Sequence, residues 1–418
     1  MKTSFWDRYK RTICNLILVL VIFGVFMIIQ YTAPATSMWF SVLRKVCTFA
    51  LAAVAMNLLN GFTGLFSLGQ AGFMLLGAYT YSIFTIAADM RTTVFRNYGD
   101  SIVNFKLPMI VALLLAGLVA AFFAFLIGLP VLRLKSDYLA IATLGFAEIV
   151  RGLVQLTQFG PVTNGPDPIN NFTSPKNIMV YAALAGVCIC IIVLLINSTY
   201  GRAFKAIRDD EIAAEAMGIN LAHHKRLSFV TSSFFCGIAG AMFAMCNSAV
   251  SSVSFTSAMT YQILLVVVIG GIGSITGSII GSFIFIGLNE WLLRGLDQGE
   301  WLGIQSTLMR AGFRKVVFAI LIMLVVLFFA KGIMGNREFS WEGIIRWFKT
   351  LPQRTKAWPA KKKAQLAERK EQKEAKKEAK AKAAEKKAKG AETLAAGEKL
   401  FTPLPVYDHV VVFEKEVQ

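Results

Sequence analysis

Long apolar blocks alternate with short polar segments along most of the chain. Several blocks run almost without charge for about 18–22 residues, which is enough to cross a ~30 Å hydrocarbon core. We therefore predict an all-α polytopic membrane protein with about ten transmembrane helices, some of them broken or half-spanning. The candidate spans are 13–32, 39–60, 63–87, 108–132, 138–157, 178–197, 228–247, 258–274, 277–293 and 315–332.

One apolar stretch is unusually rich in small and polar residues. The segment Asn57–Ser82 reads NLLNGFTGLFSLGQAGFMLLGAYTYS and contains five glycines, two asparagines and a glutamine. The clustered glycines predict a break into two part-helices, which a bilayer tolerates only against protein or a wet cavity. Helical spacing further predicts one small and polar stripe, made of Asn57, Asn60, Gly64, Ser67 and Ala71.

Two interpretations of this segment stay open. Small residues let neighbouring helices approach closely, and side-chain amides form hydrogen bonds between helices, so packing alone explains the composition. Alternatively, some of its polar side chains line a translocation pathway. The candidates for either role are Asn57, Asn60, Gly64, Ser67 and Gln70.

Composition and charge fit this membrane assignment and orient it. The chain is 56% hydrophobic and only 16% charged, which excludes an ordinary soluble protein. Lys and Arg gather at 1–12, 133–137, 198–227 and in the C-terminal tail, which predicts that both termini are cytoplasmic. The domains expected are a cytoplasmic N-terminus (1–12), a transmembrane domain (13–335) and a basic cytoplasmic tail (336–418).

The tail differs in composition from the rest of the chain. Its part at 360–390 is almost entirely Ala, Lys and Glu, which predicts a solvated helix or a disordered arm. A solvated tail needs no partner, although its positive charge favours contact with anionic membrane lipid. Nucleic acid is not expected as a partner, because no aromatic residues interleave with the charges and no reading module is present.

The cytoplasmic segment 198–227 contains a short capped helix. Asp209 is expected as its N-cap, acidic residues follow at the positive end of the helix dipole, and Gly218 is the expected stop. This predicts a helix of about two turns, preceded by another over 201–208. Such a helix is either a docking surface or simply a solvated loop. The residues assigned to docking are Asp209, Glu211, Ala214, Glu215 and Gly218.

Two charged residues fall inside the predicted span 138–157. Glu148 and Arg151 are three residues apart, so their side chains can meet on one helix face. Charges at that depth normally face a partner or a wet cavity. Either they form a self-satisfied pair that stabilises helix packing, or they serve transport or contact between subunits.

No enzymatic site is recognisable in the sequence. The phosphate-binding pattern G-x-x-x-x-G-K-[ST] is absent, so an ATPase site of the chain's own is not expected. The run GGIGSITGSIIG at 270–281 lacks the lysine and predicts a tight turn with close helix packing. Neither a metal-ligand cluster nor a nucleophilic triad is present, and no cofactor is expected.

Four stretches resemble the permeases of branched-chain amino acid ABC importers, specifically the LivM-like member of the pair. They are NGFTGLFSLGQAGFMLLGAYT, LPVLRLKSDYLAIATLGFAEIVR, GRAFKAIRDDEIAAEAMGIN and VVVIGGIGSITGSIIGSF, in family order over roughly 57–285. The resemblance implies an all-α permease of the bacterial cytoplasmic (inner) membrane. It further implies a second, LivH-like permease chain, two cytoplasmic ATP-binding subunits and an extracytoplasmic substrate-binding protein. EIAAEAMGI is similar to the coupling motif that contacts the ATPase subunits.

Other functions remain open at this point, among them a channel or a non-transporting membrane scaffold. Permeases for urea or short amides share the same motifs. From another class, an ion-coupled secondary transporter also uses glycine-broken spans, but it needs no ATPase. Transport by this chain alone, driven by an ion gradient, distinguishes that class from an ABC importer.

Overall fold

The fold is a bundle of apolar helices. The computed structural model describes residues 24, 26–32, 38–98, 103, 105–134, 136–292, 300–301, 304–305, 316–317, 319–320, 323 and 332–335. Among these residues, five helices are long and apolar enough to cross a membrane, or six if one bent pair counts as a span. The five are Met38–Phe62, Met109–Val131, Tyr138–Gln155, Ile178–Asn197 and Leu221–Asn247.

The centre of the bundle is built from three helices. They are α2 (Met38–Asn57), α3 (Gln70–Thr85) and α11 (Leu221–Asn247), and α11 packs against both of the others. Most residues of α2 and α3 are buried, as expected for helices that are apolar on all sides. At 27 residues and 1.5 Å each, α11 extends about 40 Å and begins earlier than the predicted 228.

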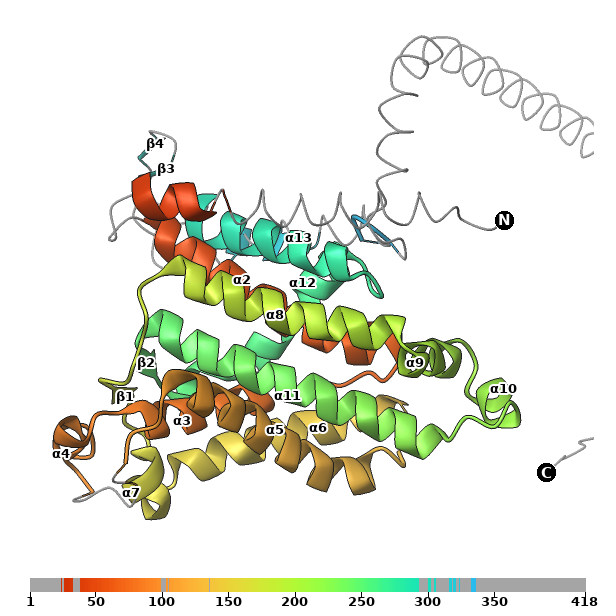
Figure 1. The fold of residues 1–418 in the computed structure, drawn as a ribbon, viewed down its shortest axis with the longest axis horizontal. Helices are drawn as coiled ribbons and strands as arrows, with labels where there is room; N and C mark the ends of the chain where they lie inside the picture. Colours follow the sequence, from red (N-terminus) through yellow and green to blue (C-terminus); the bar gives the residue numbers. More distant parts are fainter. Residues whose placement is uncertain are drawn as a thin grey trace, which may run out of the picture. The chain divides into compact units, whose positions relative to one another are not determined.

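Three further helices cover this centre and keep one side exposed. They are α5 (Met109–Val131), α6 (Ser136–Gln155) and α8 (Ile178–Asn197), all close to their predicted bounds. In Figure 1, α8 lies on the α2 side of α11, and α5 and α6 lie on the other side. Their exposed faces carry large apolar side chains, such as Leu118, Ile149 and Leu194, which suits contact with lipid or a second membrane chain.

The prediction of about ten spans is not confirmed. The predicted span 63–87 is a helix of only 16 residues, because the chain from Thr63 to Gly69 is not helical. The predicted spans 258–274 and 277–293 correspond to α12 (Ser257–Gly270) and α13 (Ile275–Ile286), which are bent by 119° into a broken span or re-entrant loop. The spans 13–32 and 315–332, like the tail 336–418, lie largely or wholly outside the described residues.

The turn between α12 and α13 confirms the prediction for the glycine run. Gly271 and Gly273 have φ of 119° and 84°, a region that favours glycine. A Cβ on Gly270 would lie 2.2 Å from the carbonyl oxygen of Gly277, and the reverse distance is 2.3 Å. The two helices therefore approach each other at a distance that only glycine permits. The short π-helix η5 (Gly287–Leu292) continues α13.

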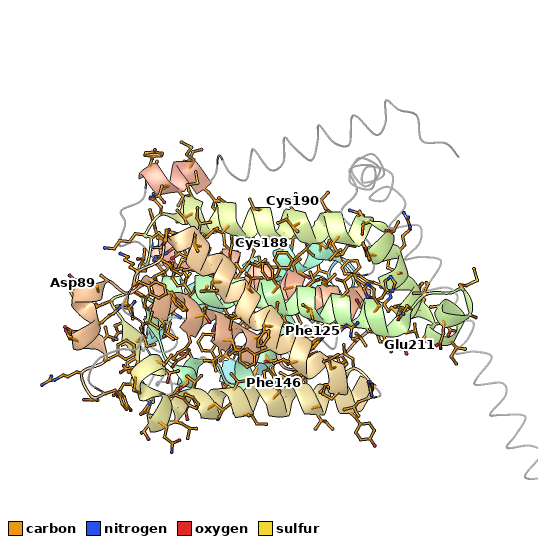
Figure 2. The ribbon with its side chains drawn as sticks, turned by 60° about the horizontal axis from the view of Figure 1, so that its bottom comes forward. Asp89, Phe125, Phe146, Cys188, Cys190 and Glu211 are labelled. Carbon is orange, nitrogen blue, oxygen red and sulfur yellow. The ribbon has the colours of Figure 1, made fainter. Side chains whose placement is uncertain are left out.

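The connecting segments gather at two opposite ends of the bundle. At one end lie α9 (Thr199–Asp209) and α10 (Glu211–Ala216), and at the other α4 (Arg91–Val94), α7 (Gly160–Thr163) and the two-stranded pair β1 (Ile169–Asn170) and β2 (Ala249–Val250) (Figure 1). The short 3-10 turns η2 (Ala88–Met90), η3 (Thr157–Phe159) and η4 (Ser252–Ser254) connect helices, and β3 (Glu300–Trp301) pairs with β4 (Ile304–Gln305). In Figure 2, Asp89 and Glu211 mark the two ends.

A buried arginine closes the end that contains α4. The Arg91 guanidinium donates hydrogen bonds to the backbone carbonyls of Ile83, Ile86, Val103 and Phe105. Burial lowers the pKa of this guanidinium, and the four carbonyls replace the water that it loses. The side chain thereby ties the end of α3 to the segment that enters α5.

Candidate functional site: the helix break and the docking loop

The break predicted within 57–82 is confirmed, but the predicted polar stripe is wrong. The five-residue π-helix η1 (Leu58–Phe62) ends α2, the chain is irregular from Thr63 to Gly69, and α3 starts at Gln70. Gly64 has a φ of 77° and is exposed. Asn57, Asn60, Gly64, Ser67 and Ala71 cannot share one helix face, because the helical spacing ends at Phe62.

The irregular stretch is held by side chains from several elements. The Asn60 amide pairs with the backbone of Ser67, accepting from its N–H at 3.2 Å and donating to its carbonyl at 3.5 Å. Hydroxyls of Thr143 on α6 and Thr260 on α12 accept from the N–H groups of Leu68 and Ala71, both at 3.1 Å. Backbone groups that a regular helix would pair are thereby satisfied by other helices.

Gln70 is fully buried at the start of α3 and faces α11. Its side-chain oxygen accepts from the Cys236 thiol at 2.7 Å, and its amide nitrogen donates to the Ser232 hydroxyl at 3.5 Å. One turn away, the Ser228 hydroxyl lies 2.6 Å from that of Thr63. Ser228, Ser232 and Cys236 follow at intervals of four, so this polar stripe on α11 was detectable in the sequence.

Asn57 connects the end of α2 with the glycine turn. Its side-chain oxygen accepts from the Gly273 N–H at 2.8 Å. Its amide nitrogen donates to the Ser274 carbonyl at 2.9 Å and the Ser278 hydroxyl at 2.8 Å. Asn57, Ser67 and Gln70 are all 0% exposed, and each has partners within the chain. In this conformation the packing interpretation therefore accounts for their polar atoms.

The segment 198–227, called the docking loop after the role that the sequence predicts for it, contains both predicted helices, with one correction to the cap. The N-cap of α10 is Asp210, whose carboxylate accepts from the N–H groups of Ile212 and Ala213 at 2.9 and 3.1 Å. Asp209, the predicted cap, is the last residue of α9, and its carboxylate binds Arg208 instead. Only Asp210 has the extended backbone that a cap requires, which the pair of adjacent aspartates did not reveal.

The remaining residues predicted for docking lie on or beside α10. Glu211 pairs with Lys225 of α11 at 2.6 Å, Ala214 is buried, and Glu215 is exposed. Gly218 has a φ of 83°, and its N–H and that of Ile219 bond the carbonyls of Glu215 and Ala214, which confirms the predicted stop.

The sequence reasoning missed the apolar part of this loop. Ile212 and Met217 are 82% and 84% exposed, although both side chains are large and apolar. Exposed apolar side chains of this size, presented on a capped helix at one end of the bundle, are typical of a protein contact.

Glu148 and Arg151 form the predicted pair on α6. The Arg151 Nε lies 2.6 Å from a Glu148 carboxylate oxygen, and the Arg151 and Glu148 side chains are 30% and 38% exposed. The neighbouring Gly145 and Gly152 are exposed, and a Cβ on either would touch nothing within 4 Å. The pair thus lies at the edge of an open face of α6. Among the described residues, no three His, Cys, Asp or Glu side chains form a metal-binding group.

Comparison with known proteins identifies the family. The model of the family described as branched-chain amino acid transport system / permease component matches residues 38–327, and the chain belongs to this family. Together with its apolar helices, this makes the chain a multi-pass membrane protein. No solved structure matches the chain.

Individual relatives carry the names LivM and LivH. The high-affinity branched-chain amino acid transport system permease protein LivM of Salmonella typhimurium is 32% identical over 284 residues, which are 60% of this chain and 62% of LivM. LivM of Escherichia coli K12 is 31% identical over the same lengths. The permease protein LivH of Salmonella typhimurium is 23% identical over 304 residues, 70% of this chain and 92% of LivH. The match thus spans about three fifths of the LivM relatives.

Proposed function

We propose that this chain is the membrane-spanning permease subunit of an ABC importer for branched-chain or related amino acids. The family membership and the LivM and LivH relatives support this assignment. The chain sits in the bacterial cytoplasmic membrane with both termini in the cytoplasm. It acts as a transport subunit without an ATPase site of its own, and a second, LivH-like permease chain completes the pathway.

The observation that carries the proposal is the exposed apolar surface of α10. Two cytoplasmic ATP-binding subunits supply the energy, and one of them docks on Ile212 and Met217, which are held in place by the Asp210 cap and the Gly218 stop. An extracytoplasmic binding protein delivers the substrate at the opposite end of the bundle. Movement of the docked ATPase then shifts the chain between inward-open and outward-open states.

The half-exposed pair on α6 is assigned to contact with the second permease chain. A charged pair on an open helix face is costly against lipid, and the exposed glycines beside it allow another helix to approach closely. The candidate pathway residues Asn57, Asn60, Gly64, Ser67 and Gln70 lie in the break or directly beside it. A change of state can free the side chains of Asn57, Asn60 and Gln70 from their present partners, so that they bind substrate instead.

Co-purification tests the docking role directly. Ile212→Asp should abolish recovery of the ATP-binding subunit with the tagged chain while the second permease chain is still recovered, because an acidic residue cannot enter an apolar pocket. Val253→Asp is the matched control, since Val253 is also apolar and 67% exposed but follows β2 at the other end of the bundle. Equal recovery of the ATP-binding subunit with both variants contradicts the docking role.

Reconstitution tests the transport function. Liposomes that contain both permease chains and both ATP-binding subunits should take up leucine, isoleucine or valine only with the binding protein and ATP. Uptake of urea or a short amide instead would change the substrate class. Uptake by this chain alone on an ion gradient would replace the ABC mechanism with secondary transport.

A further inference from the structure

The last turn of α9 reaches into the helix break at the end of α2. An Arg208 guanidinium nitrogen donates to the backbone carbonyl of Gly61 at 3.0 Å, although 147 residues separate the two in sequence. A Cβ on Gly64 would lie 3.0–3.3 Å from Arg208, against both its side chain and its Cα. Arg208 is therefore packed directly on the glycine backbone of the break.

The carbonyl of Gly61 lies at the C-terminal end of η1, where helix carbonyls commonly find their partners outside the helix. The Leu58 carbonyl accepts from the Thr63 hydroxyl, and the Leu59 carbonyl accepts from the Leu65 N–H. The Gly61 carbonyl accepts from Arg208. A cation is favourable at this position, because it meets the negative end of the helix dipole. Arg208 thus caps α2 and η1 from another helix.

The same guanidinium lies beside the glycine turn between α12 and α13. A Cβ on Gly273 would be 3.3 Å from an Arg208 nitrogen and 3.6 Å from the Gly61 carbonyl oxygen. The N–H of Gly273 is held by Asn57 at the end of α2. Three segments, α9, η1 and the turn 271–274, therefore meet at Arg208.

The other side of Arg208 belongs to the docking loop. Two of its nitrogens bind the Asp209 carboxylate at 3.0 and 3.1 Å, and Asp210 next to it caps α10. One turn earlier, the Lys205 ammonium lies 5.6 Å from the ring centre of Phe62, within the range of a cation–π contact. Two cations on one side of α9 thus contact η1 directly.

We propose that Arg208 is the positioning residue that transmits movement of α10 to the helix break at 58–69. This inference rests on the proposed function, because it assumes that an ATPase moves α10. The planar guanidinium holds the Gly61 carbonyl and the Asp209 carboxylate at once, in a fixed geometry that a lysine does not provide. A displacement of about 1 Å between α9 and η1 exceeds the reach of a 3.0 Å hydrogen bond, so the break follows α9 or releases its cap.

Uptake per ATP hydrolysed in the reconstituted complex of all subunits is the first measurement. Arg208→Ala should lower this ratio by about fivefold or more, the lower end of common coupling strengths, while the ATP-binding subunits remain bound. The ratio for Arg208→Lys should lie between those of Arg208→Ala and the unmodified chain. Arg202→Ala is the matched control. Arg202 lies on the same helix and is exposed like Arg208, but it stands six residues before the residue that bonds Gly61, so its ratio should not change.

Distances between spin labels provide a second measurement. If Arg208 were merely structural, its substitution would not affect how these distances change. The chain has six cysteines, so labels that react with thiols would not be confined to the chosen positions. Genetically encoded labels are therefore used. With an ATP analogue, the distances from a label at Asp89, at the far end, to labels at Ala213 of α10 and at Phe66 should both change in the chain that carries Arg208. In Arg208→Ala the Ala213 distance should still change and the Phe66 distance should not.

The outcomes separate the two proposals. If the unmodified complex does not couple uptake to ATP, the proposed function itself is wrong. If it does, and Arg208→Ala keeps both its ratio and the Phe66 distance change, the role of Arg208 is overturned. If Arg208→Ala does not assemble with the other subunits, the same two measurements are made on Arg208→Lys. The role of Arg208 is then overturned if Arg208→Lys has the same uptake per ATP and the same Phe66 distance change as the unmodified chain.

Discussion

Two glycine-rich interruptions lie side by side in this molecule, and they are built differently. The turn 271–274 between α12 and α13 is closed by backbone against backbone, with Gly270 and Gly277 in direct contact. The break 58–69, made of η1 and the irregular residues before α3, is held largely by side chains of other helices. Thr143 binds the Leu68 N–H, Arg208 binds the Gly61 carbonyl, and Thr260 binds the Ala71 N–H just after the break.

This difference separates a rigid element from one that can change. A contact between two backbones has no side chain that can rotate away, so the α12–α13 turn moves only as a unit. Hydrogen bonds from hydroxyl, amide and guanidinium groups can be exchanged for others at a small net cost. We therefore expect the turn to serve as the fixed support and the break as the part that rearranges.

The largest effect is expected from a methyl group placed in the turn. Gly277→Ala puts a Cβ 2.3 Å from the Gly270 carbonyl oxygen, so the two helices must separate. We expect a loss of about 3 kcal/mol in stability, as for other overpacked interiors. Thermal unfolding of the purified complex in detergent should show it as a marked fall in Tm.

A second glycine in the same segment is the control for this prediction. Gly287 has a helical φ of −60°, and a Cβ there would touch nothing within 4 Å. Gly287→Ala should therefore leave Tm unchanged or raise it, since alanine is the better helix former. A similar fall in Tm for both variants would mean that backbone contact is not what closes the turn.

An intermediate effect is expected where the turn and the break are connected. Asn57→Ala removes the partner of the buried Gly273 N–H, together with bonds to Ser274 and Ser278. An unpaired buried donor costs about 1–3 kcal/mol, so Tm should fall by less than in Gly277→Ala. Asn197→Ala, at an exposed amide at the end of α8, should have no effect. Equal Tm values for the two asparagine variants would contradict this role of Asn57.

Local patterns in the sequence were sufficient for several parts of this architecture. The turn at 270–281, the break after Asn57 and the helix stop at Gly218 follow from glycine chemistry alone. The Glu148–Arg151 pair follows from its spacing on one helix. The single polar stripe was wrong because it extended helical spacing through residues that are not helical.

Contacts between distant segments could not be predicted in the same way. Arg208 and Gly61 are 147 residues apart, and Asn57 and Ser274 are 217 apart. Nothing in the composition near Arg208 distinguishes it from other basic residues that orient a cytoplasmic loop. Span boundaries failed for a related reason, since an apolar window predicts burial but cannot place a bend such as that between α12 and α13.

The smallest effect is expected from the hydroxyls around the break. It is also the sharpest test of the difference between the turn 271–274 and the break. Thr143→Val keeps the shape of the side chain but removes the acceptor for the Leu68 N–H, a net loss of about 1 kcal/mol. The amide hydrogen exchange of Leu68 should accelerate by about fivefold, since 1.4 kcal/mol corresponds to a factor of ten. Thr143→Ser retains the hydroxyl and should exchange like the unmodified chain.

The corresponding substitution at the turn should have little effect. Thr276→Val removes a hydroxyl that lies 3.3 Å from that of Ser274, but the turn amides are held by backbone carbonyls and by Asn57. Exchange across 271–274 should therefore stay within about twofold of the unmodified chain, because surface-type polar changes cost little where other bonds persist. If Thr276→Val accelerates exchange as much as Thr143→Val does, both interruptions depend on side chains, and the distinction between a fixed support and a rearranging break is lost.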